Sequence, residues 1–189
     1  MSEDIRIALK QQIIEQHGKL VYTFTTSEKE IQILLKWKKR RQITSIILSA
    51  LTASPAVIKI FSTQTWWLYL SAFAGVILLS LSSYSLNSDG DIRLSKLTES
   101  TNSLWLIREQ YSSLLIDFDT IETKKIQEIR DVLVQKTSEI YKKSPKTGKK
   151  AYKEAQKALQ LEEEQTFQDG EAEKLLPTSL RKKKEEAHD

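Results

Sequence analysis

The stretch WWLYLSAFAGVILLSLSSYSL, Trp66 to Leu86, decides the fold, because its 21 residues include no charged side chain. A helix of this length reaches about 32 Å at about 1.5 Å per residue, and the hydrocarbon core of a bilayer is about 30 Å thick. A helix in the core of a small soluble domain normally keeps a charged face, because few such helices are enclosed on every side. We therefore predict a transmembrane helix over 66–86 and set aside a soluble core helix.

A second apolar stretch, ITSIILSALTASPAVIKIF, runs from Ile43 to Phe61. Its one charged residue, Lys59, lies close enough to the end to reach the lipid headgroups, and Pro55 is tolerable in a membrane helix. Only four residues separate the two stretches. The sequence therefore predicts an all-α membrane protein with a first transmembrane helix over 43–61, a periplasmic loop over 62–65 and a second transmembrane helix over 66–86.

The charges beside the first stretch set the orientation. KWKKRR, residues 36–41, carries five positive charges, whereas the connecting loop carries none. Because cytoplasmic flanks are enriched in lysine and arginine, both termini are expected on the cytoplasmic side. The residues that we expect to anchor the hairpin at the two membrane interfaces are Lys38, Lys39, Arg40 and Arg41 on the inner side and Trp66 and Trp67 on the outer side.

Small and hydroxylated residues form a stripe on each predicted span. They are Ser45, Ser49 and Thr52 on the first span and Ser71, Gly75 and Ser82 on the second. Such stripes either allow close helix packing or line a pore, and for each residue we favour packing. Because two spans cannot enclose an aqueous path, a pore would require a symmetric homo-oligomer, which we expect to be a tetramer or larger.

The flanking segments are predicted to be helical and cytoplasmic. Residues 1–42 form amphipathic helices that pack on the cytoplasmic domain or, alternatively, lie on the membrane surface. In the cytoplasmic domain, residues 87–181, Leu97, Leu104, Tyr111 and Phe118 recur every seven residues, which predicts one long coiled-coil-like helix from about 92 to 141 with a stutter at Lys125. This helix either forms an oligomerising stalk or folds back on residues 20–37. Residues 182–189 are expected to be a frayed tail.

Lysines are concentrated between residues 142 and 157, where seven of them accompany one glutamate. Pro145 and Gly148 predict a turn between two helices in this region. The local excess of positive charge suits a polyanion such as anionic headgroups, a nucleotide or a short single-stranded oligonucleotide, with a solvated surface as the alternative. The candidate ligand-binding residues, chosen on charge alone, are Lys142, Lys143, Lys146, Lys149, Lys150 and Lys153.

Enzymatic chemistry finds little support in the sequence. There is no cysteine, and the two histidines, His17 and His188, lie near opposite ends of the chain. No set of nucleophile, base and orienting residue can be assembled from the remaining side chains. We therefore expect a protein that is not an enzyme, with no catalytic residues, no metal site and no cofactor.

Three cytoplasmic motifs behind the hairpin resemble a known family. They are IREQYSSLLIDF (107–118), IYKKSPKTGKKAYKEAQKALQLEEEQTF (140–167) and LLPTSLR (175–181). Together with the two spans they resemble the SLATT family, the SMODS and SLOG-associating two-transmembrane effector domains, over roughly residues 20–181. The resemblance implies a bacterial anti-phage defence effector of the inner (plasma) membrane, encoded beside a companion nucleotidyltransferase or other sensor, that breaches the membrane and halts or kills the infected cell.

The resemblance also implies a non-enzymatic protein and supplies no set of binding residues to carry over. The resulting hypothesis is an oligomeric pore or channel whose opening is controlled by a nucleotide or oligonucleotide signal, with a slight preference for a ligand that holds the pore closed. Its partners would be membrane lipids, further copies of the chain and the companion nucleotidyltransferase. The alternative is a membrane-anchored coiled-coil scaffold that recruits a partner protein without forming a pore.

Overall fold

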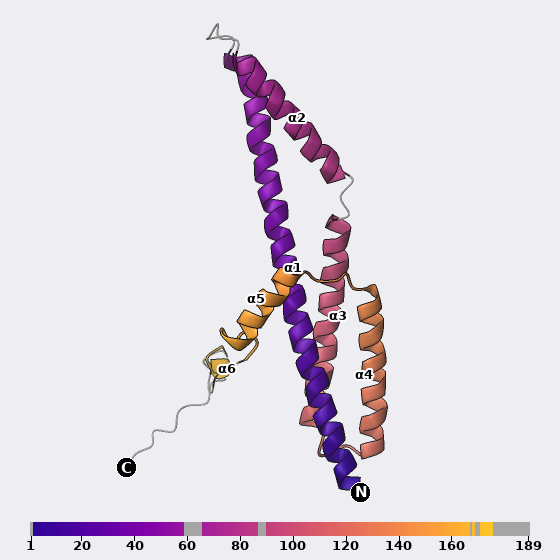
Figure 1. The fold of residues 1–189 in the computed structure, drawn as a ribbon. Helices are drawn as coiled ribbons and strands as arrows, with labels where there is room; N and C mark the ends of the chain where they lie inside the picture. The colour runs from indigo at the N-terminus through magenta and orange to yellow at the C-terminus, as the bar shows by residue number, and fades with distance from the viewer. Residues whose placement is uncertain (1, 59–65, 87–89, 167, 169–170, 176–189) are drawn as a thin grey trace, which may run out of the picture.

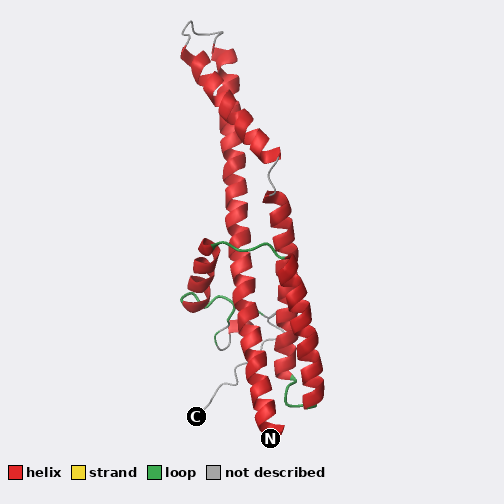
Figure 2. Ribbon diagram, turned by 45° about the vertical axis from the view of Figure 1, so that its right-hand side comes forward, coloured by secondary structure: helices red, strands yellow, loops and turns green. Residues whose placement is uncertain are grey.

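The computed structural model describes residues 2–58, 66–86, 90–166, 168 and 171–175, and its secondary structure within these residues is entirely helical (Figures 1 and 2). The all-α fold class is confirmed. The helices are α1 (Ser2–Ile58), α2 (Trp66–Leu86), α3 (Gly90–Ile116), α4 (Thr123–Lys143), α5 (Lys149–Gln160) and the short α6 (Glu171–Lys174). The molecule is elongated: α1 runs along its length, α2 returns beside the upper part of α1, and α3 continues downward beside the lower part.

Helix α1 is one continuous helix of 57 residues. The prediction of separate helices before residue 43 is therefore wrong. Gly18 does not end the helix. The threonines that follow it donate their hydroxyl hydrogen bonds to backbone carbonyls of the preceding helical turn. Thr25 and Thr26 donate from Oγ1 to the carbonyl oxygens of Val21 and Tyr22, at 2.9 and 2.8 Å. Threonine hydroxyls bonded to the preceding turn no longer compete with the helical backbone.

The upper part of the molecule is the hairpin of α1 and α2 (Figure 1). Helix α2 begins and ends at the residues that the sequence predicted for the second apolar helix. The predicted loop over 62–65 and the end of the predicted span over 43–61 lie outside the described residues. Among the residues that the structure describes, no helix combines the length and the apolarity needed to cross a membrane.

The lower part is a three-helix bundle of α1, α3 and α4. The heptad residues Leu97, Leu104, Tyr111 and Phe118 are each at most 1% exposed, so the apolar stripe predicted from the sequence faces the core. Three residues of α1 and two of α4 pack against the lower part of the stripe: Leu9, Ile13, Leu20, Ile126 and Leu133. Of the two alternatives for the long apolar segment, the structure has the one that folds back onto α1.

The predicted single helix from 92 to 141 is wrong, because the chain turns between Ile116 and Thr123 and α4 returns beside α3. The turn is polar: Asp117 accepts hydrogen bonds at its carbonyl oxygen from the amide and hydroxyl of Thr120, at 3.0 and 2.8 Å. Arg6 of α1 donates to the carbonyl oxygens of Phe118 and Ile121, which closes the end of the bundle.

The predicted turn at Pro145 and Gly148 is confirmed, since α4 ends at Lys143 and α5 begins at Lys149. Helix α5 buries an alanine face, formed by Ala151, Ala155 and Ala158, against α1. Small side chains let two helices approach closely, so α5 lies against α1 although it is mostly polar. The predicted frayed tail, residues 182–189, lies outside the described residues.

Candidate functional site

Glu30 holds the linker between α4 and α5. Glu30 lies on α1 and is only 7% exposed. Glu30 Oε2 accepts a hydrogen bond from the backbone amide of Gly148 at 3.1 Å, and Oε1 pairs with Arg93 of α3 at 2.9 Å. Arg93 also donates to the carbonyl oxygen of Lys146 at 2.9 Å. We call this network of Glu30, Arg93, Lys146 and Gly148 the clasp, and it joins α1, α3 and the linker at one point.

The clasp requires a close approach of the linker to α1. A Cβ placed on Gly148 would lie 3.2 Å from Glu30 Oε2, a contact tighter than most Cβ atoms make. Glycine at this position therefore allows the backbone amide to reach the carboxylate. The sequence predicts Gly148 as a turn residue, whereas Glu30 has no distinguishing sequence pattern that would predict its role.

The six candidate lysines do not form one cluster. Lys142 and Lys143 lie in the last turn of α4, Lys146 lies in the linker, and Lys149, Lys150 and Lys153 lie on α5. All six are exposed. Because the linker crosses α1 between the two helices (Figure 2), the lysines are distributed over two sides of α1.

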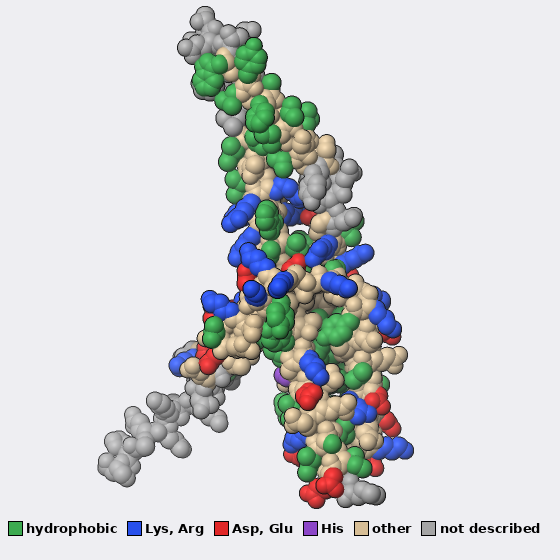
Figure 3. Space-filling model, in the orientation of Figure 1, with side chains coloured by type: hydrophobic (Ala, Val, Ile, Leu, Met, Phe, Trp, Pro, Cys, Tyr) green, Lys and Arg blue, Asp and Glu red, His purple; other side chains and the backbone are tan. Residues whose placement is uncertain are grey.

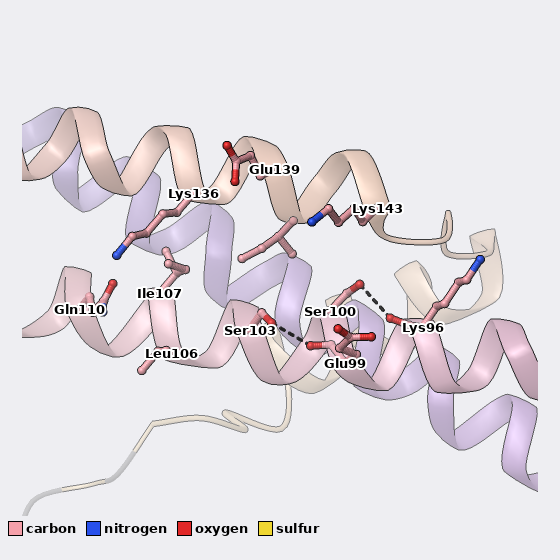
Figure 4. Close-up of a pocket in the computed structure, with 11 residues that line it drawn as sticks. Lys96, Glu99, Ser100, Ser103, Leu106, Ile107, Gln110, Lys136, Glu139 and Lys143 are labelled. Carbon is pink, nitrogen blue, oxygen red and sulfur yellow. Dashed lines mark hydrogen bonds between the residues drawn. The ribbon is translucent and has the colours of Figure 1, made fainter.

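One of these lysines, Lys143, lines a cavity of about 660 Å³ between α3 and α4, which we call the α3–α4 groove (Figure 4). The groove also contains Lys96 from α3 and Lys136 from α4, which the sequence analysis did not select. Two glutamates, Glu99 and Glu139, accompany the three lysines, and among the described residues none of the lysines has a carboxylate within ion-pair distance. All three lysines therefore lack an ion-pair partner among the described residues, and the ammonium groups of Lys136 and Lys143 reach between α3 and α4, whereas that of Lys96 points away from them (Figure 4).

The close-up of the groove shows how its polar groups are directed (Figure 4). Lys136 reaches from α4 toward α3 near Ile107 and Gln110, whereas Glu139 points away from α3. Ser100 and Ser103 donate their hydroxyl protons to backbone carbonyls of α3, at 2.8 and 3.0 Å, which leaves their oxygens able to accept a hydrogen bond.

Gln110 contributes the one buried side-chain acceptor of the groove that has no hydrogen-bond partner among the described residues, its Oε1. Leaving a buried amide oxygen unpaired costs about 1–3 kcal/mol. The groove therefore combines cations suited to an anionic group with a buried, unpaired amide oxygen beside them.

The polar stripe of the hairpin is only partly at the contact between α1 and α2. A Cβ placed on Gly75 would lie 3.7 Å from Thr52 Cγ2, so these two residues face each other and support close packing there. Ser49 and Ser82 are exposed on the single chain, and Ser45 and Ser71 are half-buried. Ser49 Oγ donates to the carbonyl oxygen of Ser45 at 2.9 Å, and Thr52 Oγ1 to that of Ser49 at 2.8 Å.

Basic side chains gather where the apolar hairpin meets the bundle (Figure 3). Of the predicted interface anchors, Lys38 pairs with Asp91 of α3 at 2.9 Å, Lys39 and Arg40 are exposed, and Arg41 is half-buried. Above them, apolar side chains cover much of the hairpin surface (Figure 3), with Ile46 68%, Phe73 66% and Leu79 70% exposed. Trp66 is 52% exposed, and the side chain of Trp67 lies outside the described part.

Comparison with known proteins assigns the family. Neither the curated proteins nor the solved structures include a match to this chain. A family sequence model matches residues 9–171, which include most of the lower bundle, the hairpin and the lysine-rich linker. On this match the chain belongs to the SMODS and SLOG-associating 2TM effector domain family, family 4.

Proposed function

We propose that this protein is a membrane effector of bacterial anti-phage immunity, which inserts the hairpin of α1 and α2 into the inner membrane. The main support is the exposed apolar surface of the hairpin, which lies directly above the basic belt, formed by Lys38, Lys39, Arg40 and Arg41. Ile46, Phe73 and Leu79 are each 66–70% exposed to solvent in the single chain. Lipid chains would cover these side chains, and the basic belt would then lie at the cytoplasmic headgroups with both termini on that side.

In this proposal the protein acts as a homo-oligomeric pore or channel and not as an enzyme. Two helices per chain cannot surround water, so several copies must arrange their hairpins around an axis. Ser49 and Ser82, which are exposed on the single chain, would then face either a neighbouring copy or the pore. Opening of the pore would dissipate gradients across the inner membrane, and growth arrest or death of the infected cell would follow.

The proposed signal is a nucleotide or short oligonucleotide made by a companion nucleotidyltransferase. The α3–α4 groove would bind its phosphates through Lys136 and Lys143, with a base lying over Ile107 and Gln110 between the two helices. Binding controls the pore only if the open and closed states bind the ligand with different affinities. Such a difference can arise here because α3 follows α2 in the chain. A ligand that changes the distance between α3 and α4 would therefore also move the lower end of the hairpin.

The alternative function is a membrane-anchored scaffold. The exposed apolar residues Leu106, Ile116 and Val132 on α3 and α4 give it a specific basis, since a partner protein could cover them. Replacing α2 and the upper part of α1 with an unrelated two-span anchor distinguishes the two functions. A scaffold keeps its activity after this exchange, whereas a pore loses it.

The experiment is dye leakage from liposomes of purified full-length protein, with and without short oligonucleotides of defined length. We expect leakage that the oligonucleotide changes, and we expect Lys136→Gln with Lys143→Gln to remove that response. The matched control, Lys150→Gln with Lys153→Gln, removes the same charge from α5, outside the groove. Liposomes that stay tight under all conditions would contradict the pore. Equal loss of response in both double variants would contradict the groove as the ligand site.

A further inference from the structure

A second cavity, of about 510 Å³, lies where the lower end of α2 and the upper end of α3 meet α1. Its α1 wall contains Leu34, Trp37, Lys38 and Arg41, whose spacing of three, one and three residues places them on one helical face. We call it the junction cavity. It is separate from the α3–α4 groove, since the two have no lining residue in common.

One end of the junction cavity is cationic. Lys38, Arg40 and Arg41 line it together with one acid, Asp91. Asp91 pairs with Lys38 at 2.9 Å. Neither Arg40 nor Arg41 has a carboxylate within ion-pair distance among the described residues. Two guanidinium groups are therefore left for an anion, and guanidinium groups bind phosphate through paired N–H donors.

Apolar side chains line the rest of the cavity. Leu34, Leu81 and Leu94 contribute to it from α1, α2 and α3, and the 66% exposed indole of Trp37 adds to the lining. An inorganic phosphate would satisfy the arginines and leave these side chains in contact with water. A ligand that carries both a phosphate and a hydrocarbon chain would satisfy both surfaces.

The cavity lies at the height where a phospholipid would present such a phosphate and chain. Arg41 precedes Ile43, the first residue of the apolar segment, by two positions, which corresponds to about 3 Å along the helix. On the proposed insertion of the hairpin, Arg40 and Arg41 lie at the depth of the lipid phosphates. Trp37 lies close to them, where indole rings are preferred.

We propose that the junction cavity binds an anionic phospholipid, with its phosphate on Arg40 and Arg41, an acyl chain along α2 beside Leu81, and the rest of the headgroup toward Trp37. This inference rests on the proposed membrane insertion and adds a specific lipid site to it. Because α1, α2 and α3 each contribute to the cavity, a bound lipid would stabilise the junction between the hairpin and the bundle.

The test measures lipid binding to the purified full-length protein in detergent by native mass spectrometry and by the lipid-dependent shift of the melting temperature. The probes are phosphatidylglycerol, phosphatidylcholine with the same acyl chains, and glycerol phosphate, which has the anionic group without chains. We expect phosphatidylglycerol to bind and to raise the melting temperature, whereas the other two probes bind at least tenfold more weakly.

Two double variants locate the site. Arg40→Gln with Arg41→Gln should weaken phosphatidylglycerol binding at least about thirtyfold, since each direct hydrogen bond from a guanidinium group to the phosphate contributes more than about 1 kcal/mol. The control is Lys36→Gln with Lys39→Gln, which removes the same charge from the same segment, and neither of these lysines lines the cavity. The control should bind the lipid as the unaltered protein does.

Three results would overturn the lipid site: equal weakening in the two double variants, equal binding of the two phospholipids, or binding of glycerol phosphate as tight as that of the lipid. Membrane insertion is measured separately, by alkaline extraction of bacterial membranes. Release of the protein by alkali would refute the proposed function, whereas retention of the protein together with any of the three binding results would refute only the lipid site.

Discussion

Replacement of Glu30 by alanine tests whether the clasp holds the α4–α5 linker on the bundle. The substitution removes the ion pair with Arg93 and the acceptor of the Gly148 amide. Breaking a fully buried ion pair costs about 3–5 kcal/mol, but the Arg93 side chain is 44% exposed, so water replaces part of the interaction. We expect the free energy for release of the linker to fall by about 2 kcal/mol, which raises the released fraction about thirtyfold.

Limited proteolysis with trypsin measures that fraction. Lys146 lies in the linker, and cleavage after it requires the chain to leave the surface of α1. When release and return are fast compared with cleavage, the cleavage rate follows the released population. The rate after Lys146 should therefore rise about thirtyfold in Glu30→Ala, whereas the rate after Lys125, at the opposite end of α4, should not change.

The control variant is Glu28→Ala, on the same helix, because Glu28 makes no ion pair among the described residues. It should leave both cleavage rates unchanged. An unchanged rate after Lys146 in Glu30→Ala would refute the clasp. Equal acceleration after Lys146 and Lys125 would also refute it, since that result would mean that Glu30 stabilises the whole bundle.

Three further predictions concern stability. Burial, followed by the charge of Arg108, lowers the pKa of His17 in the folded protein, so the unfolded state binds more protons below its ordinary pKa of about 6.5. The free energy of unfolding should therefore decrease as the pH falls from about 7.5 to about 5.5, as measured by urea denaturation. The decrease should be smaller in His17→Asn. Phe118→Ala should cost about 3–5 kcal/mol in the same assay and Ile116→Ala, 81% exposed, less than about 0.5, and equal costs would contradict the core assignment. Gly75→Ala should leave the melting temperature in detergent unchanged while Gly75→Leu lowers it, because only the larger side chain collides with α1, and equal effects would argue against close packing there.

The apolar periodicity predicted the core of the bundle but not its topology. The seven-residue repeat from Leu97 to Phe118 identified buried positions correctly, because burial depends on which side chains share a face. The repeat cannot distinguish one long helix from two antiparallel helices with the same faces buried. The polar residues Asp117, Asp119 and Thr120 and the register slip near Lys125 mark the turn, yet this segment contains neither glycine nor proline.

The candidate groove could not be predicted for the same reason. In a single helix Lys96 and Lys136 would lie about 60 Å apart. The distribution of charge along the sequence therefore does not predict that these two lysines line the same cavity. Folding of α4 onto α3 brings both into one cavity. The lysines chosen by local density are instead distributed over the end of α4, the linker and α5, and of these only Lys143 lines the groove.

The continuity of α1 has a mechanical consequence. A straight helix of 57 residues is about 85 Å long, and a tilt of about 5° at one end displaces the other end by about 7 Å. The same helix contributes Leu9 and Ile13 to the bundle core, Glu30 to the clasp and Thr52 to the contact with α2. A small rotation of the bundle would therefore become a larger displacement at the apolar end, since α1 is unbroken between the two.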